Sequence, residues 1–125
     1  MLHTLLDALS VQVWTAKPAG ELDFVNRFTA DYFGRTREEL IGEGWTNVLH
    51  ASDLPRAVEH WTRSVQTGEP YDVDFRLLRA EDRMYRWHHA SARRLAGPDG
   101  SFWIGSNVDV DAARRAEEVH QARSR

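Results

Sequence analysis

The sequence predicts an α+β domain with one five-stranded antiparallel sheet, short helices on one face of it, and a helix at each end. Strand-forming segments flank a central stretch, residues 26–68, that is crowded with helix-capping residues, which splits the strands into two and three. The length of 125 residues fits a single domain. The expected units are an amphipathic helix at 1–10, a core at 11–110 and a polar helix at 111–125.

The first ten residues are predicted to form a short amphipathic helix, because four leucines recur at helical spacing. These leucines are Leu2, Leu5, Leu6 and Leu9. A helix this short is unstable alone in water, so its apolar stripe must pack on its own domain or on a partner chain. β-rich residues follow at 11–15 and 22–25, and the turn-forming residues between them predict a hairpin.

Three helices are predicted between this hairpin and the remaining strands, each from its end signals. Asn26 is a good N-cap for the first helix. Thr36 and Glu39 form a Thr-x-x-Glu capping box for the second. Asp53 is expected to cap the longest helix, which has a proline in its first turn and ends near residue 68.

The second half of the chain is predicted to supply three strands and a final helix. Apolar and charged residues alternate from 73 to 77, which is the period of a strand. Two further strands, at 85–95 and 102–110, are joined by the hairpin turn Gly97-Pro98-Asp99-Gly100. Asp111 then caps the polar C-terminal helix.

Composition argues against several functional classes. The chain has no cysteine, which removes disulfides, thiolate metal sites and cysteinyl-flavin adducts, and fits a reducing compartment. The net charge is −3 and the cations are spread along the chain, so no nucleic-acid-binding surface is predicted. No apolar run approaches the ~20 residues that span a bilayer, and no basic secretory signal opens the chain. A cytoplasmic location without membrane contact is therefore expected.

The candidate catalytic and metal-binding groups have simpler structural interpretations. His88 and His89 are neighbours in a predicted strand, so they point to opposite faces and cannot share a metal ion. Asp53 is better used as a helix cap than as the orienting partner of a basic His50. No metal-ligand spacing, phosphate loop or nucleophile motif is present. The domain itself is therefore not predicted to be an enzyme.

The order of these segments resembles a PAS domain, and the resemblance covers essentially the whole chain. The segments that carry it are Thr36-Arg37-Glu38-Glu39-Leu40-Ile41-Gly42, Trp45 with His50 and Asp53, Gly68-Glu69-Pro70-Tyr71, Arg86-Trp87, and Asp109-Val110. Each segment is a weak signal alone. Their agreement in order along the chain makes the resemblance specific.

Three positions depart from the family pattern. Ala51 stands where a proline usually follows His50. Asp82-Arg83 replaces the expected Asp-Gly turn between the third and fourth strands, so a different or looser turn is expected there. Asp111 takes the place of the threonine in the closing Asp-Ile-Thr signature, and because aspartate also caps helices well, the junction should keep its structure.

The resemblance implies a ligand cavity between the sheet and the helices. Asn107 is one expected polar group, because it stands where a side chain faces the cavity in flavin-binding relatives. His88 is the other, because strand parity places it on one face of the neighbouring strand together with Ala90 and Ala92. Its expected apolar lining is Phe28, Phe33, Trp45 and Trp61. The alternative interpretation is that such large residues simply fill the core, which would leave a protein-interaction module with no ligand.

Neither haem nor flavin is favoured as a cofactor. The light-sensing, flavin-binding members of the family need a cysteine that this chain lacks. Haem-binding members use a histidine on the long helix, where His60 lies, but His60 falls at the edge of the apolar face and away from the expected spacing. Purified protein is therefore expected to show no visible chromophore in its absorption spectrum.

The function implied by the resemblance is regulatory: a sensory domain that binds a small ligand or mediates dimerisation. Asp109 and Asp111 are expected to pass a change in sheet geometry to the exit helix. The expected partners are a second copy, held by the terminal helices, and a downstream output domain, for which a sensor histidine kinase is favoured over a diguanylate cyclase. The alternative is a cone-shaped enzyme of the ketosteroid-isomerase or nuclear-transport-factor type, which normally places its helices first and ends in strands.

Overall fold

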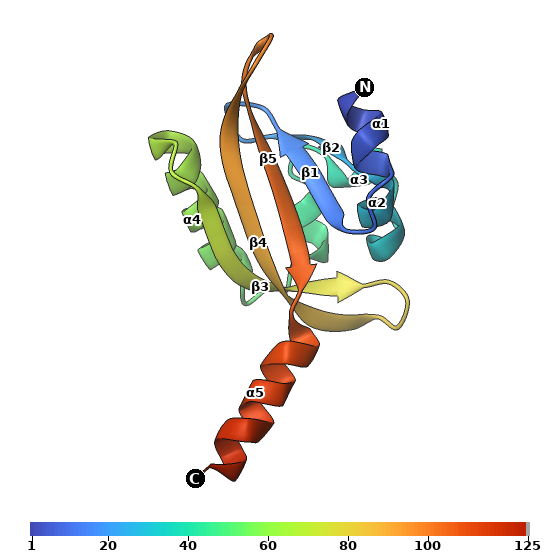
Figure 1. The fold of residues 1–125 in the computed structure, drawn as a ribbon, viewed down its shortest axis with the longest axis vertical. Coiled ribbons are helices and arrows are strands. Elements are labelled where there is room, and N and C mark those ends of the chain that lie inside the picture. Colours follow the sequence, from blue (N-terminus) through green and yellow to red (C-terminus); the bar gives the residue numbers. More distant parts are fainter. Residues whose placement is uncertain (125) are drawn as a thin grey trace.

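The computed structural model describes residues 1–124, which fold as the predicted α+β domain (Figure 1). Its elements are α1 (Leu2–Asp7), β1 (Gln12–Ala16), β2 (Leu22–Val25), α2 (Arg27–Phe33), α3 (Arg37–Leu40), the 3-10 helix η1 (Gly44–Val48), α4 (Leu54–Thr67), β3 (Tyr71–Arg79), β4 (Met84–Gly97), β5 (Gly100–Asp109) and α5 (Asp111–Arg123). The strands form one sheet in the order β2-β1-β5-β4-β3, and every neighbouring pair is antiparallel. The predicted split of two and three strands is confirmed.

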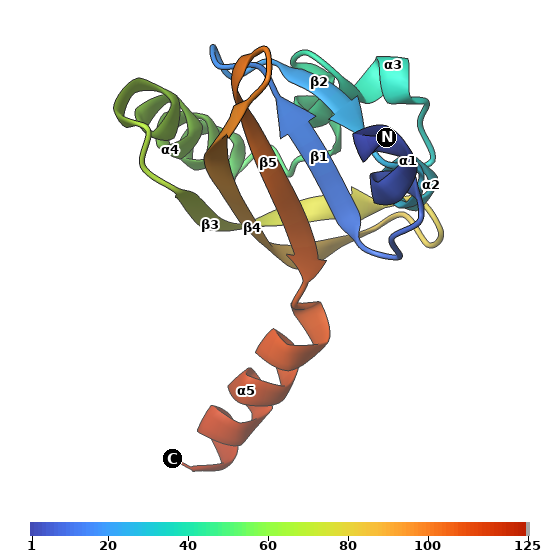
Figure 2. The same ribbon diagram turned by 45° about the horizontal axis from the view of Figure 1, so that its top comes forward.

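The main core lies between one face of the sheet and the helices α2, α3, η1 and α4, while α5 projects away from the body (Figures 1 and 2). Small residues on β4, Ala90 and Ala92, are almost fully buried in this core. They leave space for large rings, and Trp103 packs against Trp61 with their centroids 5.1 Å apart.

α1 packs on the opposite face of the sheet, and Leu6 is its buried leucine. Leu6 joins Val13 and Phe24 in a second, smaller core. The carbonyl of Leu6 also accepts a hydrogen bond from the Asn26 side chain at 2.9 Å. The other leucines of the stripe remain 41%, 58% and 46% exposed; they are Leu2, Leu5 and Leu9. The helix thus docks on its own sheet and still presents an apolar surface to solvent.

Several helix ends follow their predicted signals. Asn26 accepts a bond from the Thr29 amide at 3.1 Å. Gly34 closes α2 with φ +62°, in the left-handed region that glycine adopts without strain. Thr36 and Glu39 form the complete capping box at the start of α3.

Two predicted caps are wrong. Asp53 precedes α4, but its side chain makes no capping bond and instead pairs with the Arg76 guanidinium at 2.8 Å. Asp111 lies inside the first turn of α5, where Val110 occupies the N-cap position, and it accepts a bond from the Trp87 amide at 3.1 Å. Arg76 on the sheet takes the Asp53 carboxylate, whereas Asp111 lies one residue past the position from which a side chain caps the helix.

The turn between β3 and β4 differs from an Asp-Gly turn, as expected. Arg83 has φ +58°, a left-handed conformation that costs a residue with a Cβ more than it costs glycine. Asp82 supports the turn, because its carboxylate accepts a bond from the Met84 amide at 3.2 Å and pairs with Arg79.

Candidate functional site

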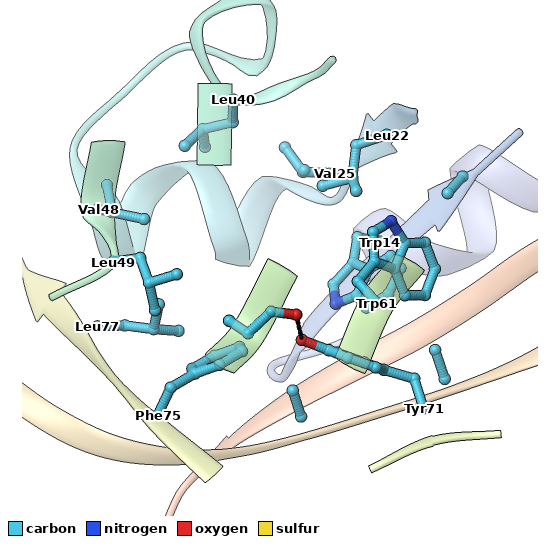
Figure 3. Packing of buried hydrophobic residues seen from close by; sticks show 14 of the residues in the cluster. Trp14, Leu22, Val25, Leu40, Val48, Leu49, Trp61, Tyr71, Phe75 and Leu77 are labelled. Carbon is cyan, nitrogen blue, oxygen red and sulfur yellow. Dashed lines mark hydrogen bonds between the residues drawn. The ribbon is translucent and has the colours of Figure 1, made fainter. Parts of the chain in front are cut away.

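A cavity of about 50 Å³ lies between the sheet and the helices that cover it. Its lining is almost wholly apolar and consists of Trp14, Leu22, Val25, Thr29, Phe33, Leu40, Trp45, Val48, Trp61, Tyr71, Phe75, Leu77 and Asn107. Figure 3 shows side chains from the sheet and the helices meeting in this region. Pockets for drug-sized ligands usually measure ~300–1,000 Å³, so this cavity as it stands suits a molecule of only a few heavy atoms.

Edge-to-face aromatic packing fixes one wall of the cavity. The rings of Trp14 and Trp61 lie 5.5 Å apart at 81°, and Tyr71 meets Trp61 at 5.0 Å and 73°. Trp61 Nε1 donates to the Gly20 carbonyl at 2.9 Å. The Tyr71 hydroxyl donates to the Ala57 carbonyl at 3.1 Å (Figure 3). Burial raises the pKa of Tyr71, so this hydroxyl keeps its proton at neutral pH.

The polar residues of the lining already have partners within the protein. Trp14 Nε1 donates to Asn107 Oδ1 at 3.2 Å, and Asn107 Nδ2 donates to Gln12 Oε1 at 3.2 Å. The Thr29 hydroxyl donates to Asn26 Oδ1. Since few hydrogen-bonding positions remain for an occupant, the cavity favours an apolar molecule.

The structure brings together four of the six predicted ligand-binding residues, namely Phe33, Trp45, Trp61 and Asn107. Their contact with a ligand stays a prediction. Phe28 must be corrected, because it is 37% exposed on α2, where the helical period turns Thr29 and Phe33 inward instead. His88 must also be corrected: it is fully buried, but its ring packs edge-on against Tyr32 at 5.4 Å, outside the cavity lining.

Sequence reasoning missed two prominent members of the lining, Trp14 and Tyr71. Both carry a signal that strand parity could have revealed. Trp14 lies directly opposite Gly105 in the β1–β5 register, on the same face as Asn107 two residues later. Tyr71 starts the run of alternating buried residues along β3.

Residues 1–124 contain neither a metal-binding cluster nor a membrane-spanning helix. No group of three or more histidine, aspartate or glutamate side chains there is placed to hold a metal ion. No helix in this part of the chain is long and apolar enough to cross a bilayer. His60 lies exposed on α4.

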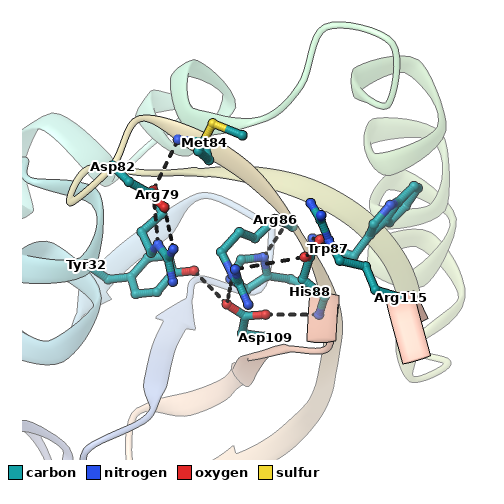
Figure 4. A network of polar contacts seen from close by, with 10 residues as sticks. Tyr32, Arg79, Asp82, Met84, Arg86, Trp87, His88, Asp109 and Arg115 are labelled. Atoms are coloured by element: carbon teal, nitrogen blue, oxygen red, sulfur yellow. Dashed lines mark hydrogen bonds and ion pairs between the residues drawn. The ribbon is translucent and has the colours of Figure 1, made fainter. Parts of the chain in front are cut away.

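A polar network joins the end of the sheet to α2 and α5 (Figure 4). Asp109 Oδ2 accepts bonds from the Tyr32 hydroxyl at 3.0 Å and from Arg86 Nε at 2.6 Å. Its Oδ1 accepts from the Asp111 amide at 3.0 Å. Burial opposes the charge on Asp109, but these donors outweigh burial and hold its pKa below the ordinary value. Asp109 therefore ties a helix, a strand and the start of α5 together.

Asp111 carries the connection into α5 itself. Its carboxylate is buried and bonds the Trp87 amide on β4 and, at 2.6 Å, Arg115 one turn further along the helix. Burial again opposes ionisation, and the Trp87 amide and Arg115 together lower the pKa of Asp111 despite it. Asp109 and Asp111 thus lie together at the junction, as predicted from the closing motif, although their role in transmission stays a prediction.

Arg114 fastens α5 to the outer face of the sheet. Its guanidinium lies 3.9 Å from the centre of the Trp87 ring, within cation–π range. Arg114 Nη1 also bonds Asp74 on β3 at 3.2 Å. These contacts all belong to the beginning of α5, so the rest of the helix extends from the domain without support from the sheet (Figure 1).

Comparison with known proteins gives consistent matches. The chain matches the family model described as the PAS fold over residues 22–107. It is 38% identical, over 94% of its length, to the uncharacterized protein y4lL of Sinorhizobium fredii. It is 32% identical, over 99% of its length, to the peroxide stress-activated histidine kinase mak1 of Schizosaccharomyces pombe. The chain spans only 14% and 8% of these two relatives.

A solved structure of an RNA-binding light-oxygen-voltage receptor superposes with a TM-score of 0.77, covering 99% of this chain and 36% of that one at 19% identity. The segment that matches the family model contains the helices around the cavity and most of the sheet. The cone-shaped enzyme alternative therefore has no support. The chain belongs to the PAS fold family and is a PAS sensory domain.

Proposed function

We propose that this PAS domain senses a small apolar molecule in its cavity and passes the binding event to α5, within a larger cytoplasmic signalling protein. The observation that carries the proposal is the continuity of β5. Asn107 lines the cavity, and Asp109, two residues later, belongs to the junction network. A shift of β5 that follows occupancy of the cavity would reach the first turn of α5 without an intermediate element.

A sensor histidine kinase is the output domain that we favour. One relative that matches this chain over nearly its whole length is named as a histidine kinase, and this chain corresponds to only 8% of it. In that arrangement the catalytic step belongs to the output domain. The PAS domain contributes regulation, through the position or stability of α5.

The cavity is expected to bind xenon, a probe that needs no hydrogen-bond partner and enters dry apolar cavities. In a titration followed by nuclear magnetic resonance, the indole N–H signals of Trp14 and Trp61 should shift, since both rings line the cavity. Asn107→Leu should strengthen xenon binding because it replaces a polar wall by an apolar one. It should also lower the melting temperature, because Trp14 Nε1 loses its acceptor, a loss of about 1–2 kcal/mol.

The matched control is Ser106→Ala, the neighbouring position on the other face of β5, which should leave xenon binding unchanged. Absence of any indole shift at saturating xenon would contradict ligand sensing. It would favour the alternative of a PAS interaction module without a ligand.

The exposed side of α1 is proposed to hold a homodimer. Leu5 is 58% exposed, so Leu5→Asp should leave the fold intact and shift the protein from dimer to monomer in sedimentation at micromolar concentration. Leu6→Ala is the contrasting variant: it removes a buried side chain and should lower the stability by about 2 kcal/mol. A wild-type protein that sediments as a monomer across this range would rule out the dimer.

A further inference from the structure

His88 is a buried imidazole with one unpaired ring nitrogen, located where β4 and β5 meet α2. Its Nδ1 lies 2.8 Å from the Arg86 carbonyl oxygen, so in the neutral ring Nδ1 carries the proton and donates to that carbonyl. Nε2 is then an acceptor, and it has no hydrogen-bond partner among residues 1–124. A buried polar atom left in this way is uncommon and calls for a physical explanation.

Charged or titratable groups face His88 from most of the elements packed around it. They are Tyr32 on α2, Arg86 on β4, Asp109 on β5 and Asp111 on α5, with the Arg79–Asp82 pair beyond Tyr32. Asp109 lies directly opposite His88 in the antiparallel register, and on the other side β3 contributes the apolar Phe75. The Coulomb effects therefore oppose one another: the two aspartates favour a charge on His88, and Arg86 disfavours it.

A proton on Nε2 would place both a charge and an unsatisfied N–H in this buried position. Burial is the main influence, and it lowers the pKa of His88. The nearest acidic group across the sheet, Asp109, is already engaged by Tyr32, Arg86 and the Asp111 amide. A charged His88 is therefore satisfied only when Asp109 leaves some of these donors or when the junction opens to water.

We propose that His88 is a proton-operated switch, whose protonation releases the first turn of α5 from the sheet. The input is a proton, so this switch goes beyond ligand sensing and works with an empty cavity. α5 is the element that opens, because only its beginning contacts the sheet and its release costs less than unfolding the core (Figures 1 and 4).

The direction of the pH effect follows from linkage. The pKa of His88 in the folded protein lies below its unfolded value of 6.5, so the closed junction has its full stability above that pH. As the pH falls below 6.5, the open form binds a proton that the closed form does not. Each further decrease of one pH unit then raises the equilibrium constant for opening by up to about tenfold.

Hydrogen exchange of the wild-type chain, measured in steps from about pH 7.5 to about pH 5, tests the proposal, with rates corrected for intrinsic exchange. The protection of amides 111–118 should fall by about tenfold or more, while that of β1 and β5 changes little. A titration of the His88 ring by nuclear magnetic resonance should have the same midpoint pH as the loss of α5 protection. The proposal is overturned if His88 titrates without a change in α5, or if all strands lose protection together.

Three variants separate His88 from His60 and His89. His88→Gln does not titrate, so α5 should lose its pH dependence. His60→Gln, on the exposed surface of α4, should behave as wild type. His89→Gln should also behave as wild type; loss of the pH dependence there would overturn the proposal, because His89 contacts Asp74, the partner of Arg114. If His88→Gln does not fold, the agreement of the two wild-type midpoints decides.

Discussion

Asp53→Ala is expected to lower the free energy of unfolding by about 2–3 kcal/mol. The Asp53 side chain is 2% exposed and accepts three hydrogen bonds from Arg76: from the backbone amide at 2.8 Å, from Nε at 2.9 Å and from Nη2 at 2.8 Å. Removal of the carboxylate leaves these donors without their acceptor. The loss stays below the ~3–5 kcal/mol typical of a fully buried pair, because the Arg76 side chain can still reach water.

Denaturant unfolding measures this loss of stability. Two further variants serve as comparisons, one at the same position and one at an exposed ion pair. Asp53→Asn keeps the shape and one acceptor oxygen, so it should lie between wild type and Asp53→Ala. Asp82→Ala removes the ion pair with Arg79 and the bond to the Met84 amide in the exposed β3–β4 turn, where water can replace both, so it should cost much less than Asp53→Ala. If Asp53→Ala were no more destabilising than Asp82→Ala, the structural role of the buried carboxylate would be refuted.

Gly105→Ala is expected to destabilise the domain by about 3 kcal/mol and to lower its melting temperature by roughly 10 °C. A Cβ at this position would lie 2.3 Å from Trp14 Cζ2, far inside van der Waals contact. The Trp14 indole lies across Gly105 and reaches Asn107 from there. The added methyl group must displace the indole, so the bond to Asn107 should break together with the cavity wall.

Gly97→Ala is the matched control on β4. Its added Cβ would approach the Phe102 ring and the Gly100 carbonyl at 3.1 and 3.0 Å, at a rim where the neighbours can adjust. It should therefore cost much less than Gly105→Ala in a thermal melt. Equal losses would show that the two variants report only the intrinsic effect of replacing glycine in a strand.

The secondary structure was predictable because each element has a local cause in the sequence. Asn26 and Thr36 start helices by bonding amides three residues away, and the alternation along 73–77 fixes a strand and its buried face. The sheet order was not predictable in this way. β1 pairs with β5, which lies at the far end of the chain, and no local pattern encodes that pairing.

The candidate site was predictable where the family resemblance marks a cavity-facing position, as it does for Asn107, and where strand parity decides which way a side chain points. Parity also placed His88 on the buried face, but Tyr32 from α2 covers it there, a contact between residues 56 positions apart that the sequence pattern does not contain. The predicted helix cap at Asp53 was wrong for a related reason. Its sequence context favours a cap, whereas in the fold a stronger donor, Arg76, competes for the same carboxylate.

The central claim is that β5 carries a change in the cavity to α5, and hydrogen exchange at constant pH tests it most directly. The protection of α5 amides is measured with and without saturating xenon, in wild type and in Asp111→Asn, with the indole signals of Trp14 and Trp61 reporting occupancy. The account predicts that xenon changes α5 protection by about fivefold in wild type and by less in Asp111→Asn. Indole shifts that show an occupied cavity, together with unchanged exchange in wild-type α5, would contradict it.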